Sequence, residues 1–300
     1  MKIDEVDVYR RYMRPLRTKP FISIAIPASV VSDAKTLREQ TLKVGSIGRA
    51  AAIFRVENIF IYRDPDTDAD HVKFIQSILN YMEVPPYMKK IVVPITQELR
   101  YVGLLPPLKT PHHVPPEIFD TQYREGIVIS RSESKCLIEL GLDKKGVMRG
   151  RCPSVNTRVT VEIVHEDGRY YYVEIVDRES LDIYWGYRVQ SISSLKEMLD
   201  LVYKNGYLII VASKKGKPLY YLENYIVDDF RNKHNVLVVF GGPYLDVDEI
   251  AINEGIDIDK YANYIVNFVP RQGVENIRTE EAIVATLSIL NYIKEKYINK

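Results

Sequence analysis

The sequence Val236-Leu-Val-Val-Phe-Gly-Gly-Pro243, followed by Tyr264-Ile-Val-Asn-Phe-Val-Pro-Arg-Gln-Gly273, decides the fold of this 300-residue chain. Each stretch begins with a run of apolar, strand-forming residues that is too short for a helix, and each ends in a turn that contains glycine. Runs that are apolar throughout are typical of strands buried on both faces of a parallel sheet. The next segment, 279–290, has the apolar spacing of a helix. This order predicts an α/β sheet whose strand ends meet at glycine turns, where open sheets of this class bind ligands.

The turns themselves allow two interpretations. Glycine lets the backbone turn sharply and lets a ligand approach without interference from a Cβ atom, but a Gly-Gly-Pro turn can also be only a turn. The ordered set of both turns and the following helix resembles the C-terminal half of the SPOUT class of RNA methyltransferases. The segment Asn267-Phe-Val-Pro-Arg-Gln-Gly-Val-Glu-Asn-Ile-Arg-Thr-Glu-Glu-Ala282 is similar to the last motif of that class. The resemblance covers nearly the whole chain. It is to the archaeal and eukaryotic branch, which carries an OB-type insertion and is described as RNA uridine methyltransferases.

The resemblance implies a trefoil knot in the C-terminal half, a homodimer, and a pocket for S-adenosylmethionine (SAM). Three turns are expected to converge on this pocket, among them a polar turn at 212–217, and a Cβ added at Gly241 is expected to clash with the ligand. Backbone groups would bind the adenine edge while apolar side chains pack against its faces. The expected cofactor-binding residues are Ala212, Ser213, Gly216, Phe240, Gly241, Gly242, Pro243, Asn267, Phe268, Val269, Pro270, Gln272, Gly273, Thr279 and Ala282.

The candidate catalytic residues follow from the chemistry of methyl transfer. Because the methyl group moves by in-line attack, the enzyme mainly positions two reactants. A uridine N3 is weakly acidic, so a base or a nearby cation that stabilises its anion would help. Near the last turn we expect Arg278, Asn276 and Glu281 in these roles, and Arg49 is a second arginine candidate. Each arginine fits a structural ion pair equally well, and carboxylates in the first turn of a helix can be dipole partners only.

Composition narrows the class of protein. The net charge is only +1, so a nucleic-acid partner must be held by local basic patches rather than by a global field. The two cysteines have no metal-ligand spacing and make a disulfide framework unlikely, and we expect no bound metal. The acidic stretch 246–254 matches no standard calcium loop and is interpreted as a solvated loop. No signal peptide and no membrane-length apolar run is present, so a cytoplasmic protein is expected.

The alternation of strand and helix patterns predicts a discontinuous α/β domain, formed by residues 1–92 and 183–300. Apolar runs at 21–26 and 59–62 read as strands, and the segment from Ser32 or Asp33 to about Val56 reads as a helix. A second helix at 69–82 and a further apolar run at 91–93 continue the alternation, which implies a parallel sheet with crossover helices. Residues 93–121 are rich in proline and form an irregular connector.

The segment 122–182 differs, because it contains four or five short strand patterns and the hairpin signal Asp167-Gly168. So many strands in about 60 residues predict a small β-barrel of the OB type. A basic loop near three consecutive tyrosines, at 170–172, suggests a surface for single-stranded RNA, although an ordinary charged loop fits equally well. An N-terminal basic arm and a histidine pair in the connector complete the candidate set. The predicted RNA-binding residues are Lys144, Lys145, Arg149, Arg151, Arg158, Arg10, Arg11, His112 and His113.

Three classes of function remain in view. The first is a SAM-dependent RNA methyltransferase that is expected to act on a uridine base in ribosomal RNA, with 2′-O-ribose or transfer RNA methylation as the alternative. The second is an RNA-binding knot and OB protein without turnover. The third, an α/β enzyme for nucleotides or other small molecules, is disfavoured because the chain has no GxGxxG motif after its first strand and no P-loop.

Overall fold

The computed structural model describes residues 14–65, 67, 69–114 and 122–299, and it divides the chain into two compact units. We call them the sheet unit and the barrel unit. The sheet unit comprises Thr18–Met82, Gln97–Pro106 and Tyr187–Lys300. The barrel unit comprises Met1–Arg17, Glu83–Thr96 and Pro107–Gly186. Each unit is described by itself.

The sheet unit contains a six-stranded parallel sheet with the order β11-β9-β10-β1-β2-β8. Its centre is the pair β1–β10, which joins the first strand of the chain to a strand from the C-terminal half. The parallel sheet predicted from the apolar runs is therefore confirmed. The strands are β1 (Phe21–Pro27), β2 (Asn58–Tyr62), β8 (Arg188–Ile192), β9 (Leu208–Pro218), β10 (Asn235–Phe240) and β11 (Tyr264–Asn267).

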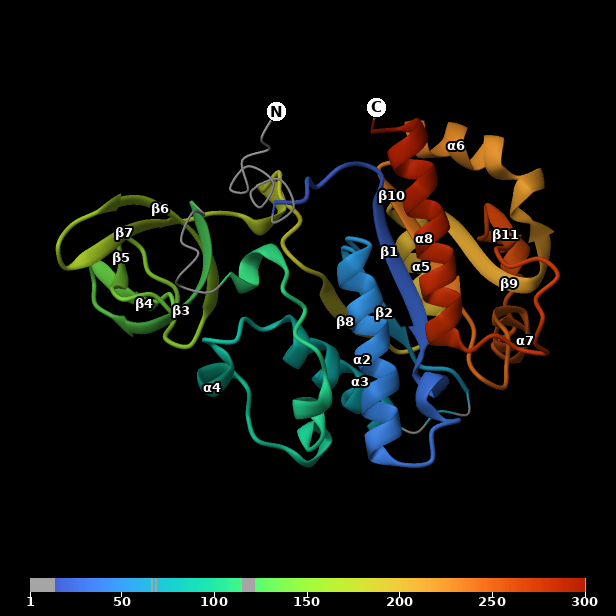
Figure 1. Ribbon diagram of the computed structural model, residues 1–300, viewed down its shortest axis with the longest axis horizontal. Helices are drawn as coiled ribbons and strands as arrows, with labels where there is room; N and C mark the ends of the chain where they lie inside the picture. The colour runs from blue at the N-terminus through green and yellow to red at the C-terminus, as the bar shows by residue number, and fades with distance from the viewer. Residues whose placement is uncertain (1–13, 66, 68, 115–121, 300) are drawn as a thin grey trace, which may run out of the picture. The chain divides into compact units, whose positions relative to one another are not determined.

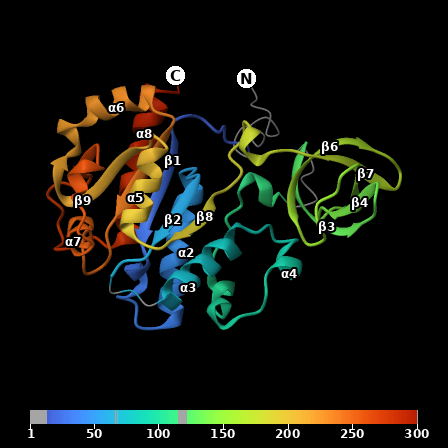
Figure 2. The ribbon, with the colours of Figure 1, turned by 180° about the vertical axis from the view of Figure 1, so that it is seen from behind.

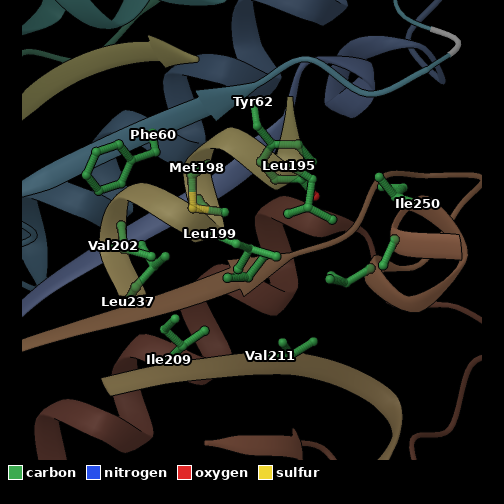
Figure 3. Close-up of a cluster of buried hydrophobic side chains, with 14 of the residues drawn as sticks. Phe60, Tyr62, Leu195, Met198, Leu199, Val202, Ile209, Val211, Leu237 and Ile250 are labelled. Carbon is green, nitrogen blue, oxygen red and sulfur yellow. The ribbon is translucent and has the colours of Figure 1, made fainter. Parts of the chain in front are cut away.

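Helices cover both faces of this sheet. Figure 1 shows α2 (Leu37–Ile53) and α8 (Thr279–Tyr297) in front of the sheet, and Figure 2 shows α5 (Leu195–Lys204) on the opposite face. On that opposite face, apolar side chains of α5 pack with those of β2, β9 and β10 in one buried cluster (Figure 3). Burial on both faces explains why these strands are apolar throughout. The other helices of the sheet unit are α6 (Glu223–Asn232), α7 (Val247–Asn253), and α3 (Ala69–Glu83), whose last residue belongs to the barrel unit.

Three local predictions differ from the structure. The helix expected from Ser32 begins at Leu37, because Thr36 and Glu39 form a capping box and the preceding segment forms the 3-10 helix η1 (Ala28–Val31). The apolar run 91–93 overlaps α4 (Lys89–Val92) rather than a strand. The polar turn expected at 212–217 lies inside β9 as a bulge, because Ile265 pairs with Val211 and the next residue, Val266, pairs with Lys217.

The barrel unit contains a closed five-stranded barrel with the order β3-β4-β5-β7-β6, as the strand patterns predict. The pair β5–β7 is parallel and the other pairs are antiparallel. Side chains from all five strands form one apolar core, to which β4, β6 and β7 contribute alternate residues. The strands are β3 (Tyr123–Arg131), β4 (Lys135–Glu139), β5 (Lys145–Arg149), β6 (Arg158–Glu166) and β7 (Tyr170–Ile175).

Short 3-10 helices connect these elements. In the sheet unit they are η2 (Gln97–Leu99), η3 (Val102–Leu104), η7 (Leu219–Tyr221) and η8 (Ile258–Lys260); in the barrel unit they are η4 (Pro111–His113) and η6 (Arg178–Ser180). Among the described residues, no helix is long and apolar enough to cross a bilayer. The same residues contain no group of three or more His, Cys, Asp or Glu side chains that could hold a metal ion.

Candidate functional site

The carboxyl ends of β9, β10 and β11 and the first turns of α8 enclose a cavity of about 370 Å³ within the sheet unit. This size falls in the usual range for small-molecule sites, and the edge at which parallel strands end is the usual place for them. The lining residues are Ala212, Ser213, Lys214, Lys215, Phe240, Gly241, Gly242, Pro243, Tyr244, Leu245, Asp246, Glu249, Val266, Asn267, Phe268, Val269, Gln272, Asn276, Ile277, Thr279, Ala282 and Thr286.

The turn after β10 is fixed from two sides. The Tyr62 hydroxyl donates to the carbonyl of Phe240 at 2.7 Å, and the Thr279 hydroxyl donates to the carbonyl of Gly241 at 3.1 Å. Burial, together with the nearby carboxylates, raises the pKa of Tyr62 well above its ordinary value, so the hydroxyl remains a donor. The N–H of Gly242 closes the turn by donating to the carbonyl of Leu245 at 2.8 Å. One wall of the cavity is therefore held in place by β2 and α8.

A second wall is formed where β9 bulges out of its ladder with β11. The side-chain amide of Asn267 donates to the carbonyl of Lys214 at 3.0 Å, while its oxygen accepts from the N–H of Val269 at 3.0 Å. The register of the two strands shifts between Ile265 and Val266. A Cβ on Gly216 would lie 2.7 Å from backbone atoms of Ile265, so this glycine permits close strand packing and does not line the cavity.

The third wall is acidic, and sequence reasoning missed it. Asp246 accepts from the Ser213 hydroxyl at 2.6 Å and from the N–H of Val247 at 2.8 Å, which caps α7. Glu249 accepts from the N–H of Asp246 at 2.7 Å. The interpretation of this stretch as a solvated loop is wrong, because α7 begins here and both carboxylates line the cavity. The Asp-x-x-Glu spacing of a capping box was the signal that could have predicted this helix.

The structure brings together most of the predicted cofactor residues. All of them line the cavity except Gly216, Pro270 and Gly273. The structure gives a different reason for glycine at positions 241 and 242 from the expected clash with a ligand, however. A Cβ on Gly241 would lie 2.9 Å from the Cα of Asp246, and one on Gly242 would lie 2.5 Å from the Ser29 hydroxyl. These two glycines are therefore required by the packing of the turn itself, before any ligand is considered.

The predicted catalytic residues are separated by the structure. Asn276 lines the cavity, and its side-chain oxygen accepts from the ammonium of Lys214 at 2.6 Å. The Glu281 carboxylate accepts from the backbone N–H of Arg278 at 3.0 Å, as a capping interaction at the start of α8. Arg278 itself is exposed there and Arg49 lies on α2, and neither lines the cavity. Lys214 was not among the candidate residues, although its segment was expected to contribute a turn to the SAM pocket.

Several predicted RNA-binding residues are instead structural parts of the barrel unit. Arg158 donates to the Glu83 carboxylate at 2.5 and 3.0 Å and to the Glu125 carboxylate at 2.5 Å. Burial opposes ionisation of Glu83, but the charge of Arg158 holds the pKa of that carboxyl well below its usual range. Trp185 and Thr160 donate to the second oxygen of Glu125, at 2.6 Å each. With its donors so engaged, Arg158 does not present its guanidinium to RNA.

Two lysines of the basic loop at 144–158 are also engaged in ion pairs. Lys144 pairs with Glu166 and Lys145 pairs with Glu139. Arg149 and Arg151 are exposed and have no carboxylate partner among the described residues. Arg10 and Arg11 lie outside the described residues. Within the basic loop, the exposed positive charge without a carboxylate partner among the described residues is therefore that of Arg149 and Arg151.

The histidine pair is buried rather than exposed. His112 and His113 are 2% and 8% exposed, and the Nε2 atoms of both lie within 2.8 Å of the carbonyl of Glu83. Burial lowers the pKa of His113 to about 3. Because this folded-state value is below the unfolded value of about 6.5, the neutral ring stabilises the fold above that pH, and the stabilisation is lost as the pH falls.

We therefore expect the free energy of unfolding of the barrel unit to fall by about 2 kcal/mol between pH 7 and pH 5 through His113 alone. The variant His113→Gln, whose amide can still donate to Glu83, should lose this pH dependence. Urea titrations followed by the fluorescence of Trp185, the single tryptophan of the chain, report on this unit. His165→Gln, at an exposed histidine of the same unit, is the matched control. An unchanged pH dependence in His113→Gln would contradict the assignment.

Comparison with known proteins agrees with this geometry. A family model described as "Putative RNA methyltransferase" matches residues 21–290. The chain belongs to this family of RNA methyltransferases. It is 31% identical to the human "28S rRNA (uridine-N(3))-methyltransferase", over 91% of this chain and 79% of that protein. It is 30% identical to the Drosophila melanogaster protein of the same description, over 90% of this chain and 61% of that protein.

Among solved structures, the A. aeolicus TrmH/SpoU tRNA modifying enzyme is similar at a TM-score of 0.42 and 10% identity, over 97% of this chain and 84% of that chain. The family match confirms the prediction, made from the glycine turns and the last motif, that the protein is an RNA methyltransferase. This member of the family is an enzyme that methylates RNA. Its α/β class with a small barrel is confirmed as well.

Proposed function

We propose that this RNA methyltransferase methylates N3 of a uridine in the RNA of the large ribosomal subunit, and that SAM binds in the cavity at the ends of β9, β10 and β11. The observation that carries the placement is that the segments predicted for SAM converge on one cavity from three different strands and one helix. The choice of uridine and of ribosomal RNA is supported by the names of the two relatives above.

The chemistry of the cavity suits SAM. Phe240, Val269 and Ile277 supply apolar surface of the kind that packs against an adenine ring. Asp246 and Glu249 supply carboxylate oxygens, which suit ribose hydroxyls and positively charged groups such as an ammonium or a sulfonium. A site with an apolar wall and an acidic wall favours binding of a ligand that is aromatic at one end and cationic at the other.

When bound, SAM supplies a methyl carbon on a positively charged sulfur. The chain supplies position and charge around it. The apolar residues of the cavity would shield the methyl group from water, and the Asn276 side-chain oxygen holds the ammonium of Lys214 at the cavity. A cation held at this point stabilises the negative charge that develops on a uridine as N3 loses its proton. Arg278, exposed between Ile277 and Thr279 of the cavity lining, remains a candidate for orienting the RNA.

We expect Lys214→Met to lower the rate of methyl transfer by about a hundredfold while SAM affinity changes little, because removal of one charge-stabilising donor has an effect of this order. Single-turnover transfer of labelled methyl groups measures the rate. Lys217→Met, which changes an exposed lysine of the same strand outside the cavity, is the control. Arg278→Ala is expected to raise the KM for RNA. A Lys214→Met enzyme with wild-type turnover would remove this lysine from the mechanism.

The function is tested by calorimetry with SAM, followed by incubation with large-subunit ribosomal RNA and mass spectrometry of the nucleosides. N3-methyluridine is the expected product. A 2′-O-methylated nucleoside, or transfer to transfer RNA instead, would favour the alternative substrates. SAM binding without any transfer to RNA would leave a binding protein as the better description.

We also infer a homodimer and a knotted C-terminal half. The knot is supported by the return of the chain after β11 to the turn after β10, where Thr279 bonds to Gly241. The dimer is supported by large aromatic side chains that are exposed on η7 and α6, at Tyr220, Tyr221 and Tyr225. Light scattering that finds only monomer at micromolar concentration would contradict the dimer.

A further inference from the structure

A buried lysine of the sheet unit lies outside the cavity, between two segments that support its walls. Lys43 of α2 is 7% exposed, and its ammonium donates to both carboxylate oxygens of Asp33, at 2.6 and 2.7 Å. The Glu280 carboxylate, in the first turn of α8, lies 3.2 Å from the same ammonium. None of the three residues lines the cavity. The ammonium therefore joins the turn that precedes α2 to the start of α8.

The two segments joined by this lysine also contact the glycine turn after β10. The turn that carries the first carboxylate follows η1, whose Ser29 hydroxyl packs so closely on Gly242 that a Cβ there would lie 2.5 Å from it. On the other side, Thr279 directly precedes Glu280 and donates to the carbonyl of Gly241 at 3.1 Å. The contacts therefore run around the turn in a closed circuit. We call its side chains the lysine clasp: Ser29, Asp33, Lys43, Glu280 and Thr279.

Stability alone does not explain the charge at Lys43. Its neighbours on the buried side of α2 include Val44 and Ile47, and an ammonium loses its hydration when it is buried among such residues. Replacing a buried ion pair by apolar side chains is often neutral or stabilising. The buried oxygen of Glu280 accepts no hydrogen bond from the described residues, so the nearby charge of Lys43 is what compensates it. A pair with this cost is suited to fixing the distance between two elements.

We propose that Lys43 is a positioning residue, which holds the first turn of α8 against the turn after β10 and thereby sets the shape of the cavity. Helices α2 and α8 lie side by side (Figure 1), and the first turns of α8 supply Thr279 and Ala282 to the cavity lining. A shift at the start of α8 therefore moves one wall of the cavity. Changes at residues that touch no ligand alter affinity by about two- to thirtyfold in such cases. This inference rests on the proposed function for its choice of SAM as the ligand.

The test compares two ion pairs between the α2 segment and α8 in the full-length protein. Lys43→Met removes the ammonium, and Glu280→Gln keeps the shape of that side chain without its charge. Arg55→Met and Glu295→Gln are the matched controls, because Arg55 follows α2 and pairs with Glu295 near the other end of α8, away from the cavity. Calorimetry should give SAM affinities about two- to thirtyfold weaker in the first two variants and unchanged in the controls. Thermal unfolding of all four variants shows how far each ion pair acts through stability.

Amide hydrogen exchange gives a readout that does not depend on SAM. In Lys43→Met and Glu280→Gln, the amides in the first turns of α8 should exchange faster than in wild type, whereas those near its C-terminus should not. If wild type binds no SAM, the proposed function fails, and faster exchange at the start of α8 still supports the clasp.

Two results overturn the inference. The first is wild-type SAM affinity, or wild-type exchange at the start of α8, in both Lys43→Met and Glu280→Gln. The second is an equal loss of SAM affinity in Arg55→Met, because either ion pair would then act only through stability. Should Lys43→Met not fold, Glu280→Gln and Glu295→Gln provide the same comparison, since each removes one carboxylate charge and leaves its cation in place.

Discussion

Replacement of Ala282 by tryptophan is expected to weaken SAM binding about a hundredfold while the protein remains folded. Ala282 is half-buried in the first turns of α8, and its methyl group lines the cavity of about 370 Å³. An indole at this position occupies space that the ligand needs, and overpacking commonly costs about 1–3 kcal/mol, or roughly 5- to 150-fold in affinity. Titration calorimetry with SAM measures the loss directly.

The control for this variant is Val284→Trp, two residues further along the same helix. Val284 is 45% exposed and does not line the cavity, so its replacement adds the same side chain to α8 without entering the site. Thermal unfolding of both variants shows that the helix has formed. Wild-type SAM affinity in Ala282→Trp would mean that SAM binds elsewhere.

The second large effect is on stability. Arg158→Met is expected to lower the free energy of unfolding of the barrel unit by about 3–5 kcal/mol, because removing one partner of a buried ion pair leaves an uncompensated charge. Here Glu125 loses its arginine and Glu83 keeps only Arg178 as an arginine partner among the described residues, at 3.2 Å, while both carboxylates stay buried at 2% and 6% exposure. Urea titration followed by Trp185 fluorescence is a local measurement, because its indole N–H donates to Glu125 at 2.6 Å.

Arg151→Met provides the comparison. Arg151 is exposed and has no carboxylate partner among the described residues, so its loss should change stability by less than about 0.5 kcal/mol. In the double variant Glu83→Gln with Arg158→Met, the loss should be smaller than in Arg158→Met alone, because one buried charge is removed with its partner. If Arg158→Met is as stable as Arg151→Met, the arginine is not part of the buried network.

The elements of the fold were predictable where burial leaves a simple pattern in the sequence. Strands β1 and β10 lie at the centre of the sheet and are covered on both faces, so their sequences are apolar except for Ser23 and Asn235. The barrel strands alternate, and the hairpin Asp167-Gly168 marks a turn between two of them. The start of α2 was missed although Thr36 and Glu39 have the spacing of a capping box. The prediction extended the helix backward from Leu37 to Ser32, past the capping box of Thr36 and Glu39.

The site was predictable only in part, because its residues come from the ends of strands that are distant in the chain. Phe240 and Ala282 could be assigned through the family resemblance, but the role of Asp246 depends on how α7 turns after β10. The burial of His113 and Arg158 was not visible locally. Both residues are polar, and no local sequence pattern marks them as buried. Only the fold brings them together with Glu83. A surface interpretation is the natural error for such residues.

The pairing of β1 with β10 has a consequence for the synthesis of the protein. Phe21 lies opposite Asn235, so one side of the central strand β1 has no partner until most of the chain has left the ribosome. The barrel strands pair only with one another, and all of them precede β9 and β10 in the chain. The barrel ladder can therefore be complete while β1 still lacks its partner β10. A long-lived unpaired strand edge of apolar residues is a site for aggregation. Assembly of the nascent chain should therefore be limited by its final third, and truncation within that third should yield insoluble protein rather than a smaller folded one.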